Sequence, residues 1–331
     1  MQSSITENII VKVLSESNMK GMILQTPNSL GQYGNIEFVF DDRTECDYVV
    51  VINQVLEKSD VYCDPQNVWA LMMEPSIDGF FDFTRYGHEQ YRKVFTTNKQ
   101  NVHSKYVQSH IMTPWHTGRS YDTLLNHEVG KKEKMISSVS SNKSFLPGHK
   151  KRIDFVNKLK EADLGIDFYG RGTNPIEDKW QALYPYKFSL AIENSSSPDY
   201  WTEKLSDCFM AYTIPIYYGC TNIDNYFPPG SVLKIDINNP AHSIKVIKEA
   251  VQNNYYEKNF DALIEARNRY LSEYHFFPCL ANHILKDIQS PNNKSGQKQA
   301  IYILPMKRSL FQRFKSFYQR LNSNLQQTEI N

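Results

Sequence analysis

The chain has 331 residues, of which 40% are hydrophobic and 22% charged, so it has enough apolar material to form folded cores and is unlike a disordered chain. Its 37 Lys and Arg residues nearly balance its 36 Asp and Glu residues, and the formal net charge is +1. That balance excludes a globally basic nucleic-acid-binding protein and a strongly acidic protein, although a local basic patch is still possible. At roughly 100–200 residues per domain, the length predicts about two domains.

The cysteines and the N-terminus indicate the compartment. The five cysteines are odd in number and have no CxxC spacing, which argues against a zinc site or a disulfide framework and favours a reducing compartment. No basic stretch followed by a long apolar run opens the chain, and no window approaches 18 uninterrupted apolar residues. We therefore expect a cytoplasmic protein, with contact at the inner face of a membrane as an alternative.

The first third of the chain alternates short apolar runs with polar segments. The runs 9–14 and 47–53 are rich in β-branched residues and predict buried strands. Three further short runs predict strands over 67–75, 93–98 and 105–112. The segments between them are long enough for helices, which favours an open α/β sheet. The polar and charged stretch 118–134 is typical of a linker between domains.

A second α/β series follows the polar stretch. The pattern predicts strands over 135–142, 166–172, 186–195 and 213–219, and helices over 149–162 and 202–212, with two more between 241 and 275. In the helix 149–162, Ile153, Val156 and Leu159 share one face, which we expect to be its buried face. Two α/β domains in tandem, each with a mostly parallel sheet, account for this series.

The composition changes again near residue 290. A polar segment that lacks core-forming residues predicts a flexible linker, and residues 307–321 then repeat Phe, Leu and Tyr at helical spacing among five basic residues and no acid. Such a helix can lie in an anionic membrane interface. The alternative is that its apolar stripe packs on the preceding domains.

Polar residues gather where the strand 186–195 ends. The strand delivers Glu193 and Asn194 to its carboxyl end, and the helix that follows has Thr202, Glu203 and Lys204 in its first turn. In open α/β sheets ligands bind beyond the carboxyl ends of strands, and helix N-termini suit phosphates. The pattern predicts a phosphate site, with Lys204 adding a full charge. The alternative is structural: Thr202 caps the helix, Glu203 complements its dipole and Lys204 is solvated.

The same region resembles a known family. The segments YKFSLAIENS, DYWTEKLSDCF, TIPIYYG and NYFPPGS occur in order over residues 184–231 and are similar to the signature of the α-1,3/1,4-fucosyltransferases of glycosyltransferase family 10. The resemblance implies an α/β protein of the GT-B type, with two facing Rossmann-like domains and, here, a C-terminal amphipathic tail. The domains would be an acceptor-binding domain (1–133), a GDP-fucose-binding domain (134–290), and a linker with a basic amphipathic tail (291–331).

The resemblance also implies which residues bind the donor. Lys204 and Arg152 would offset the charge of the GDP leaving group, Glu203 would accept hydrogen bonds from the ribose, and further contacts would come from Gly170, Asn194 and Tyr200. Arg152 lies in a basic HKKR run that a solvated face also explains, and a simple turn explains Gly170 almost as well. Glu193 would either join the donor site or be a structural carboxylate that orients Lys204 or a nearby loop. The family needs no divalent metal or other cofactor, and the sequence has no convincing Asp-x-Asp pair.

An inverting transfer also needs a base for the acceptor hydroxyl. Glu74 is our candidate, because it ends an apolar strand just before Pro75 and the family has a glutamate in a comparable Glu-Ser-Pro or Glu-Pro element. The order here is Glu-Pro-Ser, and a buried or capping glutamate is the alternative. His88, His110 and His116 are weaker candidates: each lies near a predicted loop, and simple exposure is the alternative to a catalytic role.

The function that the resemblance implies is transfer of L-fucose from GDP-fucose to a glycan acceptor. The acceptor would be a GlcNAc or Glc hydroxyl of an N-acetyllactosamine- or lactose-like unit, joined in α-1,3 linkage with inversion. The alternatives are a GT-B transferase that uses another nucleotide sugar and a non-catalytic glycan-binding relative. Nucleic acid is not an expected partner, because the basic residues cluster only near the end of the chain.

Overall fold

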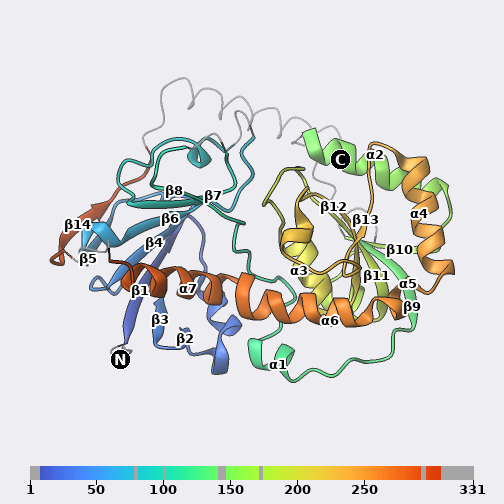
Figure 1. Ribbon diagram of the computed structural model, residues 1–331, viewed down its shortest axis with the longest axis horizontal. Coiled ribbons are helices and arrows are strands. Elements are labelled where there is room, and N and C mark those ends of the chain that lie inside the picture. Colours follow the sequence, from blue (N-terminus) through green and yellow to red (C-terminus); the bar gives the residue numbers. More distant parts are fainter. Residues whose placement is uncertain are drawn as a thin grey trace. The chain divides into compact units, whose positions relative to one another are not determined.

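The chain folds into two compact units (Figure 1). The structure is a computed structural model that describes residues 8–77, 81–99, 102–140, 147–170, 174–291 and 296–306. Unit 1 contains the described residues of Met1–Asn8, Lys20–Glu37 and Ser109–Lys294, and unit 2 those of Ile9–Met19, Phe38–Gln108 and Ser295–Asn331. The division differs from the predicted boundary between 133 and 134, which lies inside unit 1.

The first sheet has seven strands in the order β2-β3-β1-β4-β6-β7-β8. Five neighbouring strands run parallel: β1 (Ile9–Ser15), β4 (Tyr48–Ile52), β6 (Val68–Leu71), β7 (Lys93–Thr96) and β8 (Tyr106–Gln108). At one edge β2 (Gln32–Tyr33) pairs antiparallel with β3 (Ile36–Val39). Every residue of β4 and β6 is buried, as expected for central strands covered on both faces. The five predicted strands of this region are therefore confirmed.

Short turns, rather than long helices, connect the described strands of unit 2. Over both units, the 3-10 turns among the described residues are η1 (Lys20–Gln25), η2 (Pro27–Ser29), η3 (Pro65–Asn67), η4 (Asp82–Thr84), η5 (Lys179–Ala182) and η6 (Ile223–Asn225). The expectation that helices separate the strands of the first third is wrong for the described residues 38–99, where only η3 and η4 form. The connection between β5 (Ser59–Cys63) and β6 holds Pro65 and is too short for a stable helix.

A strand near the C-terminus belongs to unit 2. The strand β14 (Gln299–Ile303) pairs antiparallel with β5 (Ser59–Cys63), and Lys298 Nζ lies 2.9 Å from Asp47 Oδ1. The prediction of a linker from 291 onwards is thus wrong for these five residues, because the strand-forming QAIYI sequence was outweighed by the polar residues before it. The predicted amphipathic helix 307–321 lies outside the described residues.

The second sheet forms the centre of unit 1 and is wholly parallel. Its order is β10-β9-β11-β12-β13, with bounds β9 (Lys134–Val139), β10 (Ile166–Tyr169), β11 (Tyr186–Ile192), β12 (Ile214–Tyr218) and β13 (Leu233–Lys234). Because all five strands point the same way, their carboxyl ends meet at one edge of the sheet. The four strands predicted for this region are confirmed, and the short β13 was not predicted.

Unit 1 also contains helices, of which α3 (Glu203–Met210) packs directly on this sheet. They are α1 (Tyr121–Leu125), α2 (Pro147–Glu161), α3 (Glu203–Met210), α4 (Pro240–Gln252), α5 (Tyr255–Lys258), α6 (Phe260–Arg269), the π-turn η7 (Tyr270–Tyr274) and α7 (Phe276–Ile288). The helix α3 packs on β11 and β12, while α2 packs on α4 (Figure 1). The buried face of α2 contains Phe155, Val156 and Leu159, together with Arg152, whereas Ile153 is only half-buried. The buried face of α2 is therefore rotated relative to the predicted one, because the prediction did not anticipate a buried arginine.

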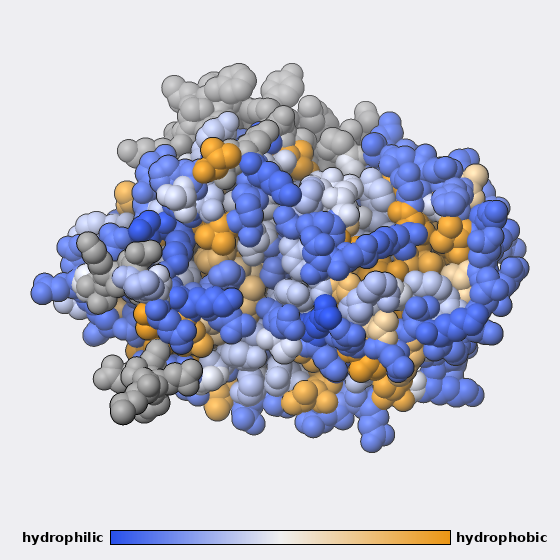
Figure 2. Space-filling model, in the orientation of Figure 1, coloured by the Kyte–Doolittle hydropathy of each residue, from blue (hydrophilic) through white to orange (hydrophobic). Residues whose placement is uncertain are grey.

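Several properties of the described residues bear on the sequence predictions. The visible face of the molecule is mostly hydrophilic, with hydrophobic residues in separate patches (Figure 2). No described helix is both long and apolar enough to cross a membrane. All five cysteines are free and buried. In the same part of the chain, no group of three or more His, Cys, Asp and Glu residues is arranged to hold a metal ion.

A glycine after β12 provides a test of the packing at the edge of this sheet. A Cβ atom at Gly219 would lie 2.4 Å from Glu193 Cγ and 2.6 Å from Tyr217 Oη, both in buried residues. We expect Gly219→Ala to lower the free energy of unfolding by roughly 1–3 kcal/mol, the usual cost of overpacking a core. Gly21→Ala is the control, since a Cβ there meets no atom within 4 Å. Equal stability of the two variants in denaturant titrations would contradict the packing described here.

Candidate functional site

Unit 1 has a cavity of about 640 Å³ at the carboxyl edge of its parallel sheet. Strand ends, the helix α2 and the first turn of α3 all contribute to its wall, which consists of His116, Ser138, Val139, Ser140, Arg152, Val156, Gly170, Pro175, Ile176, Glu177, Lys179, Leu190, Ile192, Glu203 and Lys204. The size is within the range of small-molecule sites. Of the predicted donor-site residues, Arg152, Gly170, Glu203 and Lys204 line this cavity.

A buried carboxylate holds Lys204 at the cavity. Glu193 follows β11, and its side chain has no exposed surface. Its Oε1 accepts a hydrogen bond from the backbone N–H of Thr202 at 2.7 Å, and its Oε2 lies 2.8 Å from Thr202 Oγ1 and 3.3 Å from Lys204 Nζ. Burial raises the pKa of Glu193, although the charge of Lys204 opposes that shift. Glu193 therefore orients Lys204, one of the two roles left open for it.

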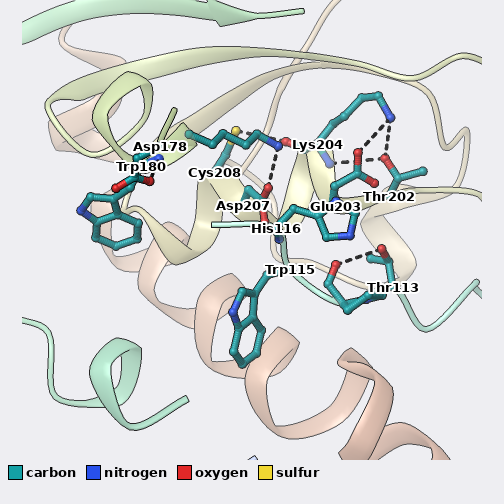
Figure 3. A network of polar contacts seen from close by, with 12 residues as sticks. Thr113, Trp115, His116, Asp178, Trp180, Thr202, Glu203, Lys204, Asp207 and Cys208 are labelled. Carbon is teal, nitrogen blue, oxygen red and sulfur yellow. Dashed lines mark hydrogen bonds and ion pairs between the residues drawn. The ribbon is translucent and has the colours of Figure 1, made fainter. Parts of the chain in front are cut away.

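Thr202 joins the helix cap to this network. It is the N-cap of α3, and its hydroxyl accepts from the backbone N–H of Lys204 at 3.3 Å and from Lys204 Nζ at 2.9 Å (Figure 3). A hydroxyl has one donor and two acceptor positions, so it can also donate to Glu193. The predicted capping role is confirmed, but Lys204 is not simply solvated, because only 23% of its side chain is exposed. Burial lowers its pKa, yet Glu193 and Glu203 outweigh that effect and raise it.

Glu203 faces the same cavity as an ionised carboxylate. Its Oε1 lies 3.4 Å from Lys204 Nζ. Burial alone would raise the pKa of Glu203, but Lys204, Lys179 and His116 together outweigh it and lower the pKa to about 2. Because the folded-state pKa lies below the unfolded one, the group stabilises the fold at pH values above its ordinary pKa, and this stabilisation is lost as the pH falls towards 2. Glu203 thus remains a hydrogen-bond acceptor at neutral pH.

A second buried carboxylate was missed by the sequence analysis. Asp207, on α3, has no exposed side-chain surface; its Oδ2 lies 2.6 Å from Lys179 Nζ and its Oδ1 accepts from the backbone N–H of His116 at 2.8 Å (Figure 3). Burial alone would lower the pKa of Lys179, but the charges of Asp207 and Glu203 outweigh that effect and raise the pKa above its usual value. The three residues are 28 or more positions apart in the chain, so no local sequence pattern predicts that they come together.

Arg152 and Asn194 meet beside the cavity. Arg152 is 6% exposed and donates from Nη1 to Asn194 Oδ1 at 2.9 Å, so the explanation of a solvated basic face is wrong. Burial lowers the pKa of its guanidinium, and the carboxylate of Glu193 opposes this. Gly170 has a φ of 120°, and a Cβ there would lie 1.9 Å from the carbonyl oxygen of Ser140, so the backbone itself requires glycine. Tyr200 is 3% exposed and is not among the residues of the cavity wall.

The candidate base and two of the histidines lie elsewhere in the fold. Glu74 is half-buried in unit 2, three residues beyond the end of β6 and therefore at the carboxyl edge of the parallel strands there. His88 and His110 are 3% and 5% exposed, so the alternative of simple exposure does not hold for these two histidines. The ring of His110 stacks on Trp201, and burial lowers its pKa to about 4. His116 is exposed at the cavity wall.

Comparison with known sequences identifies similar proteins. The profile described as "Glycosyltransferase family 10 (fucosyltransferase) C-term" matches residues 129–287. The human 4-galactosyl-N-acetylglucosaminide 3-alpha-L-fucosyltransferase 9 is 35% identical over 133 residues, which cover 38% of this chain and 36% of the relative. A bovine 3-galactosyl-N-acetylglucosaminide 4-alpha-L-fucosyltransferase is 30% identical over 181 residues, covering 51% of this chain and 44% of the relative. The chain thus spans less than half the length of these curated relatives.

Comparison with solved structures supports the fold. A crystal structure of an alpha1,3-fucosyltransferase with GDP-fucose has a TM-score of 0.52 and 17% identity, covering 90% of this chain and 95% of that one. A second structure titled as an alpha1,3-fucosyltransferase has a TM-score of 0.51 and 17% identity, over 83% of this chain and 94% of that one. At this identity the likeness concerns the fold alone, and it agrees with the predicted α/β fold with parallel sheets.

The buried pair in this site leads to a stability test. Glu193→Gln leaves the partly buried Lys204 without its main counter-charge, and we expect the free energy of unfolding to fall by about 2–4 kcal/mol. The control is Glu161→Gln, which breaks a surface pair with Lys158 whose side chains are 65% and 57% exposed, and which should leave stability unchanged within error. Chemical denaturation at pH 7 measures both. Equal stabilities would show that the Glu193 carboxylate does not hold Lys204.

Proposed function

The chain belongs to glycosyltransferase family 10 by its C-terminal domain, residues 129–287, and from this membership we propose that it transfers L-fucose from GDP-fucose to a glycan hydroxyl with inversion at the anomeric carbon. The observation that supports the donor most strongly is the cavity wall, where three cationic side chains, Arg152, Lys179 and Lys204, surround one open volume. A nucleoside diphosphate is the kind of ligand that such a wall complements.

The positive charge has a catalytic purpose in this proposal. Breaking the bond between the anomeric carbon and the β-phosphate oxygen leaves added negative charge on GDP, and preorganised cations stabilise such charge effectively. Lys204 and Arg152 are the proposed phosphate contacts, each worth roughly 1.5–3 kcal/mol as a charge-assisted hydrogen bond. Because these side chains supply the charge, the proposed reaction requires no divalent metal.

The remaining donor contacts follow from the same wall. Glu203 is proposed to accept hydrogen bonds from the ribose hydroxyls, which suits a carboxylate whose lowered pKa keeps it ionised at neutral pH. Asn194 is proposed to contact the donor beside Arg152, from which its side chain accepts a hydrogen bond. Gly170 allows the backbone at the cavity wall to approach a ligand closely. Tyr200, being buried, is proposed to support the loop before α3 rather than to stack on the nucleotide.

Glu74 is the proposed general base. It would take the proton of the acceptor hydroxyl as that oxygen bonds to the anomeric carbon and GDP departs. We propose a GlcNAc or Glc hydroxyl in an N-acetyllactosamine- or lactose-like unit as the acceptor, in α-1,3 linkage. The name of the 35%-identical human relative, a 4-galactosyl-N-acetylglucosaminide 3-alpha-L-fucosyltransferase, supports this choice.

The location of the protein is a separate proposal. We propose a cytoplasmic protein that contacts an anionic membrane through 307–321, supported by the five basic residues of that segment. Any truncation that tests it must begin after Met306, because β14 pairs with β5 and its removal would disturb unit 2.

Replacing Lys204 tests the donor site. We expect Lys204→Ala to weaken GDP binding in calorimetry by roughly 10–100-fold, the loss of one charge-assisted hydrogen bond. Lys234→Ala is the control, because Lys234 is exposed and pairs only with Asp224 at the surface among the described residues. Circular dichroism verifies that both variants are folded. Unchanged GDP affinity in folded Lys204→Ala would remove this residue from the phosphate site.

Replacing Glu74 tests the chemical step. We expect Glu74→Gln to reduce kcat for transfer by about 100-fold or more while the Kd for GDP stays the same, since a general base acts on the acceptor and not on the donor. Glu89→Gln, an exposed change in the same unit, is the control and should keep normal kcat. Normal turnover of Glu74→Gln would show that another group accepts the proton.

A further inference from the structure

We propose that Glu177 selects the base of the donor nucleotide, by accepting hydrogen bonds from N1–H and the N2 amino group of guanine. The inference rests on the proposed function, because it concerns the nucleotide held by the same cavity. Glu177 lines that cavity, although neither the strand pattern nor the family signature pointed to it. Three observations support the assignment: the charge balance of the cavity, the contrast with its neighbour Asp178, and the aliphatic residues that line the same cavity.

The charge balance singles out Glu177. The other carboxylates at or behind the cavity wall each have a cationic partner: Glu193 and Glu203 pair with Lys204, and Asp207 pairs with Lys179. Among the described residues, no Lys, Arg or His forms an ion pair with Glu177, and its side chain is exposed at the wall. A carboxylate only accepts hydrogen bonds, so the natural ligand for it is a group with adjacent donors.

The neighbouring acid, Asp178, has the structural contacts of this loop. Asp178 caps the turn η5: its Oδ1 accepts from the backbone N–H of Trp180 at 2.9 Å, and its Oδ2 lies 2.6 Å from Arg119 Nη2. Asp178 and Trp180 therefore fix the turn without help from position 177 (Figure 3). Two consecutive acids divide the tasks, one holding the backbone and the other lining the cavity.

The cavity that Glu177 lines suits an aromatic base. Aliphatic side chains form much of the cavity surface, namely Val139, Val156, Ile176, Leu190 and Ile192. A flat heterocycle buries its faces against such groups and satisfies its polar edge with a few placed acceptors or donors. Glu177 directly follows Ile176, so one short segment supplies both an apolar contact and a carboxylate.

The chemistry of the bases then selects guanine. Its edge presents two neighbouring donors, N1–H and the N2 amino group, which match the two oxygens of one carboxylate. Adenine and cytosine place an acceptor beside their amino group, and the N–H of uracil lies between two carbonyl oxygens, so each of them would bring an acceptor against the carboxylate. A guanosine diphosphate is therefore the nucleotide that this wall distinguishes from others.

Three nucleotides that differ only in the base test the proposal in the full chain. Inosine diphosphate lacks the N2 amino group, and xanthosine diphosphate has a carbonyl oxygen in its place. By calorimetry we expect the unmodified protein to bind GDP at least about tenfold more tightly than inosine diphosphate, the loss of a hydrogen bond to a charged group. In Glu177→Ala that ratio should fall below about threefold. In Glu177→Gln, the amide N–H can donate to the new carbonyl, so xanthosine diphosphate should bind more tightly than it does to the unmodified protein.

Glu161→Gln is the matched control, because Glu161 is exposed on α2 and is not part of the cavity wall. It should keep the original preference for GDP. If the unmodified protein binds GDP without preferring it to inosine diphosphate, or if Glu177→Ala keeps the preference, the role of Glu177 is overturned while the proposed function stands. If the unmodified protein binds no GDP, the proposed function itself is overturned, and the inference with it.

Discussion

The ion pair between Glu193 and Lys204 is the interaction on which the site depends. A carboxylate with no exposed surface is costly unless it is hydrogen-bonded and paired, and here the N-cap of α3 and Lys204 satisfy both of its oxygens. The same contacts fix the first turn of α3, and so they place Lys204 and Glu203 on the cavity wall. The helix cap, the burial of the Glu193 carboxylate and the placement of Lys204 at the cavity are therefore one arrangement.

The parallel sheet explains why this arrangement forms at one edge. Because β9, β10 and β11 run in the same direction, the residues that follow them gather around one volume, and α3 begins there. Asp207, one turn further along α3, repeats the principle by binding Lys179 and the backbone of His116. The fully buried carboxylates Glu193 and Asp207 thus lie behind the partly exposed cations Lys204 and Lys179, which line the cavity.

The local signals in the sequence predicted much of the fold and part of the site. Strands rich in β-branched residues and the cap at Thr202 were identified because their patterns are local, and the family signature led to Lys204 and Glu203. The Lys179–Asp207 pair was not predicted, because it joins residues 28 positions apart. The inward turn of Arg152 was missed because a helical pattern treats arginine as an exposed residue, and β14 was missed because its partner β5 lies more than 200 residues earlier.

A crystal structure of the chain with bound GDP would test the central claim most directly. The account predicts that the diphosphate lies in the unit 1 cavity, with a phosphate oxygen within hydrogen-bond distance of Lys204 Nζ and the pair between Lys204 and Glu193 intact. Diphosphate density elsewhere in the molecule, or a Lys204 side chain that has left Glu193 and does not contact the phosphates, would contradict it.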